Sequence, residues 1–197
     1  MTVQSHGLGG RVALLDPKEL TGARKETYDL MNSKAVPWAK KSGFKAQTSD
    51  GKMIGPFNGF MFSPEITEWF LNWEDVEQEH TTLTNRERQV VILSVVAVWK
   101  CDYERYAHAA LARTIGMPDA AVEALCNGNP ATDLSDKEQL AQRFTTKLTA
   151  EHEIDDNLYT EIETAFGSQG IVDIIQLAGH YITISSLLNT FKVPVPN

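Results

Sequence analysis

Apolar and polar residues alternate along most of this chain with the period of amphipathic α-helices. Asp16 followed by Pro17 is typical of a helix start, which predicts a helix over about residues 17–33, and Pro37 is expected to interrupt whatever follows. Ser63-Pro64 opens a second helix. Its apolar residues recur at helical spacing, namely Ile66, Trp69, Phe70, Trp73 and Val76.

Two capping-box patterns mark the starts of further helices. Thr84 and Glu87 form a T-x-x-E pattern ahead of a strongly apolar run, and Ser135 and Glu138 repeat the pattern later in the chain. The first box opens about 30 residues that contain neither Pro nor Gly. This stretch forms either one long central helix or two helices broken near Trp99.

The remaining helices are expected where Gly and Pro bound apolar segments. They cover residues 118–125, 135–150, 156–166 and 170–191. The last is apolar on most sides, and such a helix is buried in a domain or in an oligomer interface. A β-branched run at residues 90–98 has the composition of a strand, but its length and the preceding cap favour a helix. The pattern predicts an all-α bundle of seven or eight helices.

Two segments lack a clear period. Residues 1–15 contain three Gly and are expected to form an N-terminal arm, ahead of one helical domain over residues 16–197. Residues 42–62 are rich in Gly, Ser, Lys and Asp, which predicts a long loop, and long loops are often functional. At its aromatic tip Phe57 and Asn58 are candidate substrate-binding residues, because neighbouring Gly residues leave the backbone free to approach a ligand.

Composition narrows the choice of partners and compartment. The net charge of −8 excludes nucleic acid as the main partner, because phosphate contacts need clustered Lys and Arg. The apolar run at residues 90–99 is shorter than the roughly 20 residues that span a bilayer, so no membrane partner is expected. The N-terminus does not resemble a secretory signal, which favours a cytoplasmic location. Two cysteines, Cys101 and Cys126, form no disulfide framework and fit a reducing compartment.

The residues with the clearest chemical potential are Cys101, Glu104 and His108. Their spacing places a thiol, a carboxyl and an imidazole on one face of a helix. Enzymes use these groups as nucleophile, general acid or base, and proton shuttle. The plainer interpretation is a surface Glu–His pair beside a buried Cys. All three are also possible metal ligands, but a metal site needs further ligands, and no metal is expected.

The stretch from Thr84 to Leu125 resembles the core of the carboxymuconolactone decarboxylase family, which also contains alkylhydroperoxidase D. It has an LTxRER-like helix start, Cys101 at the first position of a degenerate C-x-x-C, and His108 four residues after the second position. A G-M-P segment follows, as in the family. The resemblance implies an all-helical, alkylhydroperoxidase D-like fold and a homo-oligomer, as a dimer, trimer or hexamer.

Two departures from the family pattern change the expected chemistry. Glu104 stands where the peroxidase branch has its second cysteine, and a carboxylate cannot resolve a sulfenic acid. Cys126 could replace that thiol only if the fold brings it near. Gln89 stands where the family has an acidic residue, which leaves a neutral hydrogen-bonding group. Gln89 and Tyr181, on the apolar terminal helix, are further candidates for substrate binding, although Tyr181 also fits a core or interface role.

These features favour a cofactor-independent acid–base enzyme of the carboxymuconolactone decarboxylase-like family. His108 would act as general base or acid, Glu104 would orient it or handle a second proton, and Cys101 would line the pocket. The substrate would be a small or polyketide-like carbonyl acid or lactone, undergoing decarboxylation, lactone processing or double-bond isomerisation through an enolate. The alternatives are a thiol-dependent peroxidase that uses Cys101, and a non-catalytic binding or structural subunit, which Gln89 favours.

Overall fold

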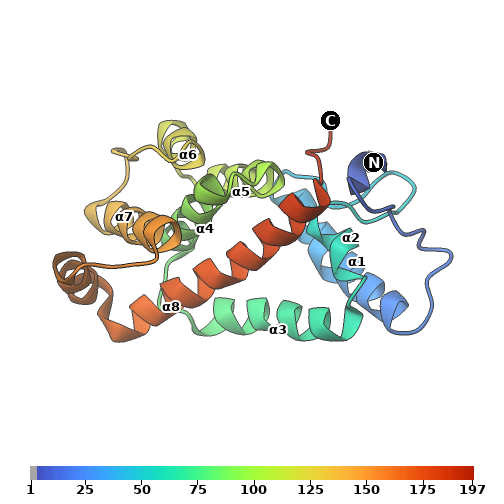
Figure 1. The fold of residues 1–197 in the computed structure, drawn as a ribbon, viewed down its shortest axis with the longest axis horizontal. Helices are drawn as coiled ribbons and strands as arrows, with labels where there is room; N and C mark the ends of the chain where they lie inside the picture. The colour runs from blue at the N-terminus through green and yellow to red at the C-terminus, as the bar shows by residue number, and fades with distance from the viewer. Residues whose placement is uncertain (1–3) are drawn as a thin grey trace. The chain divides into compact units, whose positions relative to one another are not determined.

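A computed structural model describes residues 4–197, and the regular structure of this part is helical (Figure 1). One isolated bridge between Gln47 and Met53 is the sole β-type pairing among these residues. The helices are a short 3-10 turn, η1 (Gly7–Gly9), and α1 (Gly22–Lys41), α2 (Pro56–Phe60), α3 (Pro64–His80), α4 (Asn85–Trp99), α5 (Asp102–Thr114), α6 (Asp119–Cys126), α7 (Asp136–Glu151) and α8 (Asp156–Phe191). The prediction of an all-α fold is confirmed.

The chain forms two compact units. Unit 1 comprises the chain up to Glu79 together with Ser186–Asn197, and unit 2 comprises His80–Ser185. In unit 2, helix α4 packs against α5, α6 and α7 (Figure 1). Eight consecutive residues of α4, from Gln89 to Val96, are buried. A helix enclosed on all sides needs no polar face, so its β-branched run is stabilised by packing in spite of modest helix propensity.

The chain breaks between α4 and α5, so the second of the two predicted alternatives is confirmed. Lys100 adopts the left-handed conformation, with φ 51° and ψ 46°, and its N–H donates to the carbonyl of Ala97. Cys101 is extended and is the N-cap residue of α5. The expectation that Cys101 lies within the same helix as Glu104 and His108 is therefore corrected: it immediately precedes that helix.

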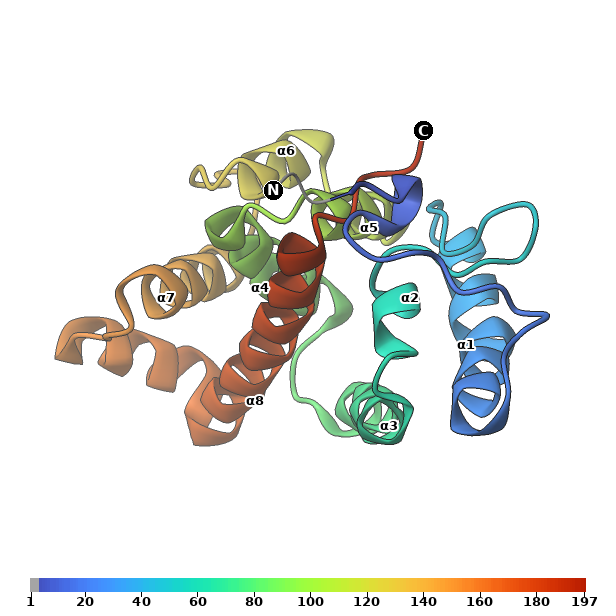
Figure 2. The same ribbon diagram turned by 45° about the vertical axis from the view of Figure 1, so that its right-hand side comes forward.

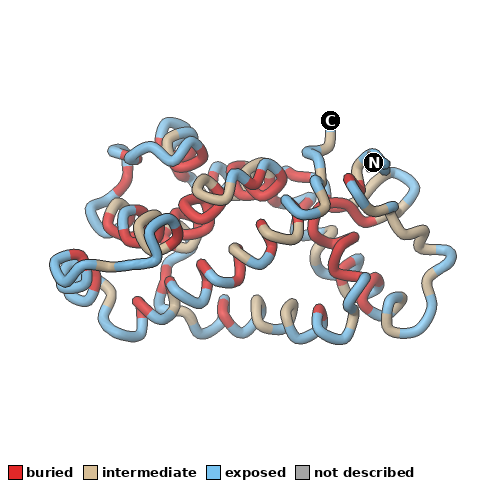
Figure 3. Tube along the Cα trace, in the orientation of Figure 1, coloured by how far each residue is buried: buried red, intermediate tan, exposed pale blue. Residues whose placement is uncertain are grey.

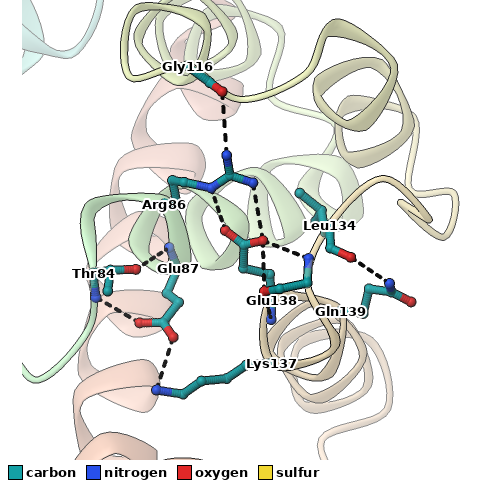
Figure 4. Close-up of polar contacts among 9 residues, drawn as sticks. Thr84, Arg86, Glu87, Gly116, Leu134, Lys137, Glu138 and Gln139 are labelled. Atoms are coloured by element: carbon teal, nitrogen blue, oxygen red, sulfur yellow. Dashed lines mark hydrogen bonds and ion pairs between the residues drawn. The ribbon is translucent and has the colours of Figure 1, made fainter.

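Both capping boxes are present and start α4 and α7 (Figure 4). The Thr84 hydroxyl accepts from the Glu87 N–H at 3.2 Å, and the Glu87 carboxylate accepts from the Thr84 N–H at 2.7 Å. The corresponding distances in the Ser135–Glu138 box are 3.3 Å and 2.9 Å. Each box satisfies two backbone N–H groups that have no partner within the helix, which explains why both helix starts could be predicted from four residues.

Helix α8 bends at Gly167, whose φ of 66° and ψ of 173° are not helical. Two predicted helices, over residues 156–166 and 170–191, therefore correspond to its two parts. By length and composition α8 is apolar enough to cross a membrane, a test that the buried core helices of soluble proteins also pass. Half of its most apolar window is buried within the protein.

The start predicted for the first helix is wrong. Asp16 instead closes a turn, in which its side chain accepts from the N–H of Lys18 at 2.9 Å, and α1 begins at Gly22. Side chains such as Asp compete in this way with helix formation. The expected interruption at Pro37 is also wrong, because α1 continues past residue 33 and contains Pro37. The helix cost of a proline, about 3 kcal/mol, is similar to the gain from burying one large apolar side chain such as Met31, which is 1% exposed.

The N-terminal segment packs against the end of α8 within unit 1. The Arg11 N–H donates to the Phe191 carbonyl at 2.6 Å, and its guanidinium donates to the Thr190 carbonyl at 2.9 Å. Gly10 adopts a φ of 66°, and a Cβ there would lie 2.1 Å from the Phe191 oxygen. Residues 1–3 of the predicted arm lie outside the described residues, and the single domain over 16–197 stays a prediction.

Candidate active site

Glu104 and His108 form a buried pair on α5. Their spacing of four residues places one side chain a turn above the other, and His108 Nε2 lies 3.3 Å from Glu104 Oε2. The two side chains are only 4% and 5% exposed. The pairing predicted from the spacing is therefore present, but it is enclosed by protein and is not the solvated surface pair of the plainer interpretation.

Gln89 brings α4 into this pair. Its Oε1 lies 2.9 Å from His108 Nδ1, and both residues are 3% exposed. The imidazole is therefore held at both ring nitrogens, by an amide from α4 and by a carboxyl group from its own helix. An ionic or strongly polar group at this depth is tolerated only when such partners are supplied.

Nε2 of His108 faces the Glu104 carboxyl group in either orientation of the Gln89 amide. If the amide oxygen accepts from Nδ1–H, the lone pair of Nε2 in the neutral ring faces the carboxyl group. If the amide is turned over and donates to Nδ1, the ring carries its proton on Nε2, which again points at Glu104. The pair is therefore placed so that a proton can pass between the imidazole and the carboxyl group.

Tyr181 on α8 restricts the orientation of the imidazole. Its ring meets the His108 ring edge to face, with centroids 4.8 Å apart and an interplanar angle of 88°. Tyr181 is 7% exposed. The structure thus brings together four residues that the sequence marked as candidates, Gln89, Glu104, His108 and Tyr181, from three different helices of unit 2.

Cys101 is 1% exposed and is held at the N-terminus of α5. Burial raises the pKa of its thiol to about 11, and the negative charge of Glu104 adds to this effect. The N–H of Glu104 and the hydroxyl of Ser185 act in the opposite direction but do not outweigh burial. At neutral pH Cys101 is consequently a thiol, whereas reactive cysteines have pKa values of roughly 3.5–7.5.

Ser185 belongs to the site and was not marked by sequence reasoning. It is fully buried, and its hydroxyl, which lowers the pKa of the Cys101 thiol, has no other hydrogen-bond partner among residues 4–197. It follows Tyr181 by four residues and therefore shares its face of α8. That spacing was the signal that could have identified it.

The second cysteine does not form a disulfide with the first. Cys126 ends α6, is buried, and is a free thiol like Cys101. Burial raises its pKa as well. Among the described residues, no group of three or more His, Cys, Asp or Glu side chains is arranged to hold a metal ion.

Phe57 and Asn58 belong to unit 1. The loop prediction for this stretch is wrong in part, because both residues lie in the short helix α2, whose five residues are all buried. The Asn58 side chain accepts from the Leu15 N–H at 3.0 Å and donates to the Ala13 carbonyl at 3.2 Å, so it secures the N-terminal segment. A role for either residue in substrate binding stays a prediction.

No protein-family model matches the chain, and no curated protein sequence matches it significantly. Solved structures do resemble it. An uncharacterized peroxidase-related protein from Silicibacter sp. TM1040 superposes with a TM-score of 0.76 over 99% of this chain and 96% of its own, at 16% identity. A second such protein, from Ralstonia eutropha JMP134 and described as an alkylhydroperoxidase AhpD core, gives 0.73 over 96% and 93%, at 15% identity. The chain has the alkylhydroperoxidase D-like fold.

A third neighbour with this fold is the debrominase Bmp8, solved as a cysteine-to-alanine variant in complex with 2,3,4-tribromopyrrole. It superposes with a TM-score of 0.68 over 85% of this chain and 87% of its own, at 10% identity. At such identities the alkylhydroperoxidase D-like architecture is shared, while function has to be argued from the site itself.

Proposed function

We propose that this chain is an acid–base enzyme that acts on a small or polyketide-like carbonyl acid or lactone without a cofactor. The observation that carries the proposal is the buried Glu104–His108 pair, whose imidazole is held at its other nitrogen by Gln89. A buried carboxyl–imidazole pair can accept a proton at one stage of a reaction and return it at another. The high pKa of the neighbouring Cys101 thiol, about 11, disfavours chemistry that begins with a thiolate.

The proposed roles follow from the contacts of each side chain. His108 transfers the proton to or from the substrate, and Glu104 orients the imidazole or handles a second proton. Gln89 fixes the ring through Nδ1 and, unlike a carboxylate at the same position, does not stabilise a permanent imidazolium. Cys101 lines the site as an un-ionised thiol.

The reaction class is one that passes through an enol or enolate. In a decarboxylation, the electron pair of the breaking carbon–carboxylate bond moves into the carbonyl group, CO2 leaves, and His108 delivers a proton to carbon. In a double-bond isomerisation, the pair removes a proton from one carbon and returns it to a conjugated position. The decarboxylation consumes one proton, which bulk solvent returns to the pair, whereas the isomerisation gives back the proton that it removed.

A thiol-dependent peroxidase is the second candidate. Two observations favour it: Cys101 occupies the N-cap of α5, where a helix terminus stabilises negative charge, and two structural neighbours are described as peroxidase-related. A peroxide would have to oxidise Cys101 to a sulfenic acid, and an external thiol would have to reduce it, because Glu104 cannot serve as resolving group.

The experiment is deuterium incorporation into a panel of β-keto acids, vinylogous acids and carboxylated lactones in D2O, followed by NMR together with CO2 release. We expect turnover by the wild type and at least about a hundredfold loss in His108→Ala and Glu104→Gln, since general acid–base groups contribute roughly 100- to 10,000-fold. Cys101→Ser should retain most activity, and His80→Ala serves as a control for histidine loss away from the pair.

Peroxide turnover distinguishes the two candidates. The same variants are assayed with an organic hydroperoxide and a dithiol reductant. Catalytic peroxide loss that disappears in Cys101→Ser but persists in His108→Ala would overturn the acid–base proposal. Full turnover of a carbonyl acid by His108→Ala would also overturn it.

A further inference from the structure

The sequence contains two Asn-Gly dipeptides, and the structure holds them in different ways. Asn58-Gly59 lies in α2 within unit 1, and Asn127-Gly128 forms the turn that follows α6 within unit 2. The dipeptide is chemically reactive because glycine has no Cβ, so its main-chain nitrogen can approach the side-chain amide of the preceding asparagine. Attack by that nitrogen on the amide carbon closes a succinimide ring and releases ammonia.

The turn after α6 is open to solvent. Helix α6 packs against α4 and α5 (Figure 2), and Figure 3 shows the turn that follows it in the colour of exposed residues. Asn127 and Gly128 are both exposed, and Gly128 adopts a φ of 70°. Apart from the adjoining residues, a Cβ on Gly128 would meet only the Cβ of Ala97 among residues 4–197, at 3.7 Å. Unit 2 therefore leaves room for a ring to close at this dipeptide.

Two hydrogen bonds hold the reacting groups, and both lie at the end of a short helix. The Asn127 side-chain amide donates to the Glu123 carbonyl at 2.8 Å, and the Gly128 N–H donates to the Leu125 carbonyl at 3.0 Å. Helix α6 has eight residues, and the last turn of a helix frays in local opening events. Opening of this one turn frees the Gly128 nitrogen for attack, without unfolding of the core.

The same dipeptide in α2 is protected from this reaction. Asn58 is 3% exposed, and its side chain is bonded to the main chain of Leu15 and Ala13, at 3.0 Å and 3.2 Å. A Cβ on Gly59 would lie 2.7 Å from a methyl carbon of Leu187, so no space remains beside this glycine. Ring closure here would break two buried hydrogen bonds and displace packed side chains.

We propose that Asn127 is a site of spontaneous deamidation, at which the chain acquires an aspartate or an isoaspartate. The Gly128 nitrogen loses its proton to solvent and bonds to the amide carbon of Asn127. The carbon–nitrogen bond of the side chain then breaks, and ammonia leaves with a proton from water. Water opens the succinimide at either carbonyl, so water is the one reactant consumed. This site is independent of the proposed acid–base function.

The modification should loosen the end of α6. An isoaspartate adds a methylene group to the main chain, and it replaces an amide donor by a negative charge at a helix C-terminus, where such a charge is unfavourable. Cys126 directly precedes the site, ends α6 and is 6% exposed. The lost hydrogen bond and the added charge together favour opening by roughly tenfold. Alkylation of Cys126, which requires this opening, should accelerate in proportion.

The test is peptide mapping of the full chain by mass spectrometry during incubation at mildly alkaline pH and physiological temperature. We expect Asn127 to convert at least about tenfold faster than Asn58, because the opening that frees Asn58 disrupts a buried segment. Asn129 is a second internal control, because it precedes a proline, whose nitrogen carries no proton. Asn127→Gln keeps the amide but needs a larger ring, so it should stay unconverted. After incubation, Cys126 should react with iodoacetamide about tenfold faster in the wild type than in Asn127→Gln.

Two results would overturn the inference. Conversion of Asn127 no faster than that of Asn58 or Asn129 would show that the open turn does not promote the reaction. Equal alkylation rates of Cys126 in incubated wild type and incubated Asn127→Gln, despite conversion of Asn127, would show that the modification leaves the end of α6 intact.

Discussion

The N-termini of α4 and α7 are linked by two crossed ion pairs, and this link allows a quantitative prediction. Each capping box contains a basic residue immediately before its glutamate, and each basic residue contacts the glutamate of the other box (Figure 4). Arg86 Nε lies 2.6 Å from Glu138 Oε1, and its Nη2 lies 3.2 Å from Oε2. Lys137 Nζ lies 3.0 Å from Glu87 Oε1. The carboxylates are buried, with side chains 8% and 6% exposed.

The perturbation is Arg86→Ala. Removing one partner of a fully buried ion pair costs about 3–5 kcal/mol, and an exposed pair contributes only about 0.2–1 kcal/mol. Arg86 is 36% exposed, which screens the pair, and Glu138 keeps its hydrogen bonds from Ser135. We therefore expect a loss of about 1–2 kcal/mol in the free energy of unfolding, which corresponds to a fall in Tm of about 3–6 °C for a chain of this size.

The effect should depend on pH. Burial by itself raises the pKa of Glu138, but the hydrogen bonds from Arg86 and Ser135 lower it by a larger amount. The pKa of Glu138 in the folded protein therefore lies below its ordinary value. A carboxyl group with a lowered folded pKa stabilises the fold above its unfolded pKa, about 4.3 for Glu. That contribution is lost as the pH falls through the folded pKa. The difference between wild type and Arg86→Ala should accordingly be complete at neutral pH and shrink in acid.

The assay is urea unfolding of wild type, Arg86→Ala, Glu138→Gln and the double variant, which gives the coupling energy of the pair. Arg113→Ala is the matched control, because Arg113 pairs with Asp119 and Glu123 at the surface. It should cost less than about 1 kcal/mol. Equal losses in Arg86→Ala and Arg113→Ala, or a coupling energy that persists in acid, would refute the reasoning.

Three further predictions concern the site and the N-terminal segment. Alkylation of Cys101 by iodoacetamide should be slow at neutral pH and accelerate toward pH 11, and Glu104→Gln should move this profile to lower pH because it removes a neighbouring negative charge. Gln89→Glu would give His108 a second carboxylate and stabilise the imidazolium. The acid limb of the pH–activity profile should therefore move to higher pH, as measured in steady-state assays on whichever substrate is turned over. Gly10→Ala should lower the free energy of unfolding by about 1–3 kcal/mol in urea titrations, because a Cβ there meets main-chain oxygens at the end of α8 and φ is positive.

Local signals predicted those parts of the fold that depend on neighbouring residues. The capping boxes at Thr84 and Ser135 act within four residues, and the contact of Glu104 with His108 needs only one helical turn. The start expected at Pro17 failed because the Asp16 side chain forms a turn of its own. The capping boxes and the turn at Asp16 are all formed by hydrogen bonds within a few residues. At Asp16 the hydrogen bond of the turn prevailed over helix formation.

Contacts between residues far apart in the sequence could not be predicted from the hydrophobic pattern or from residue spacing. Gln89 was a candidate because of its position in the family resemblance, but its bond to His108 joins two helices and could not be derived from spacing. The two Asn-Gly dipeptides are also alike in sequence, and only the packed structure shows that Asn58 is buried and Asn127 is exposed.

Glu104 links the two candidate chemistries. In a dithiol enzyme this position would supply a resolving thiol, and a carboxyl group there removes that function; burial raises the pKa of Cys101, and the charge of Glu104 adds to this effect. The same carboxyl group gives His108 a partner with which to share a proton. One side chain thus takes the place of a resolving thiol and completes an acid–base pair, so the case for proton transfer and the case against dithiol chemistry both involve Glu104. Both therefore stand or fall on measurements at this single position.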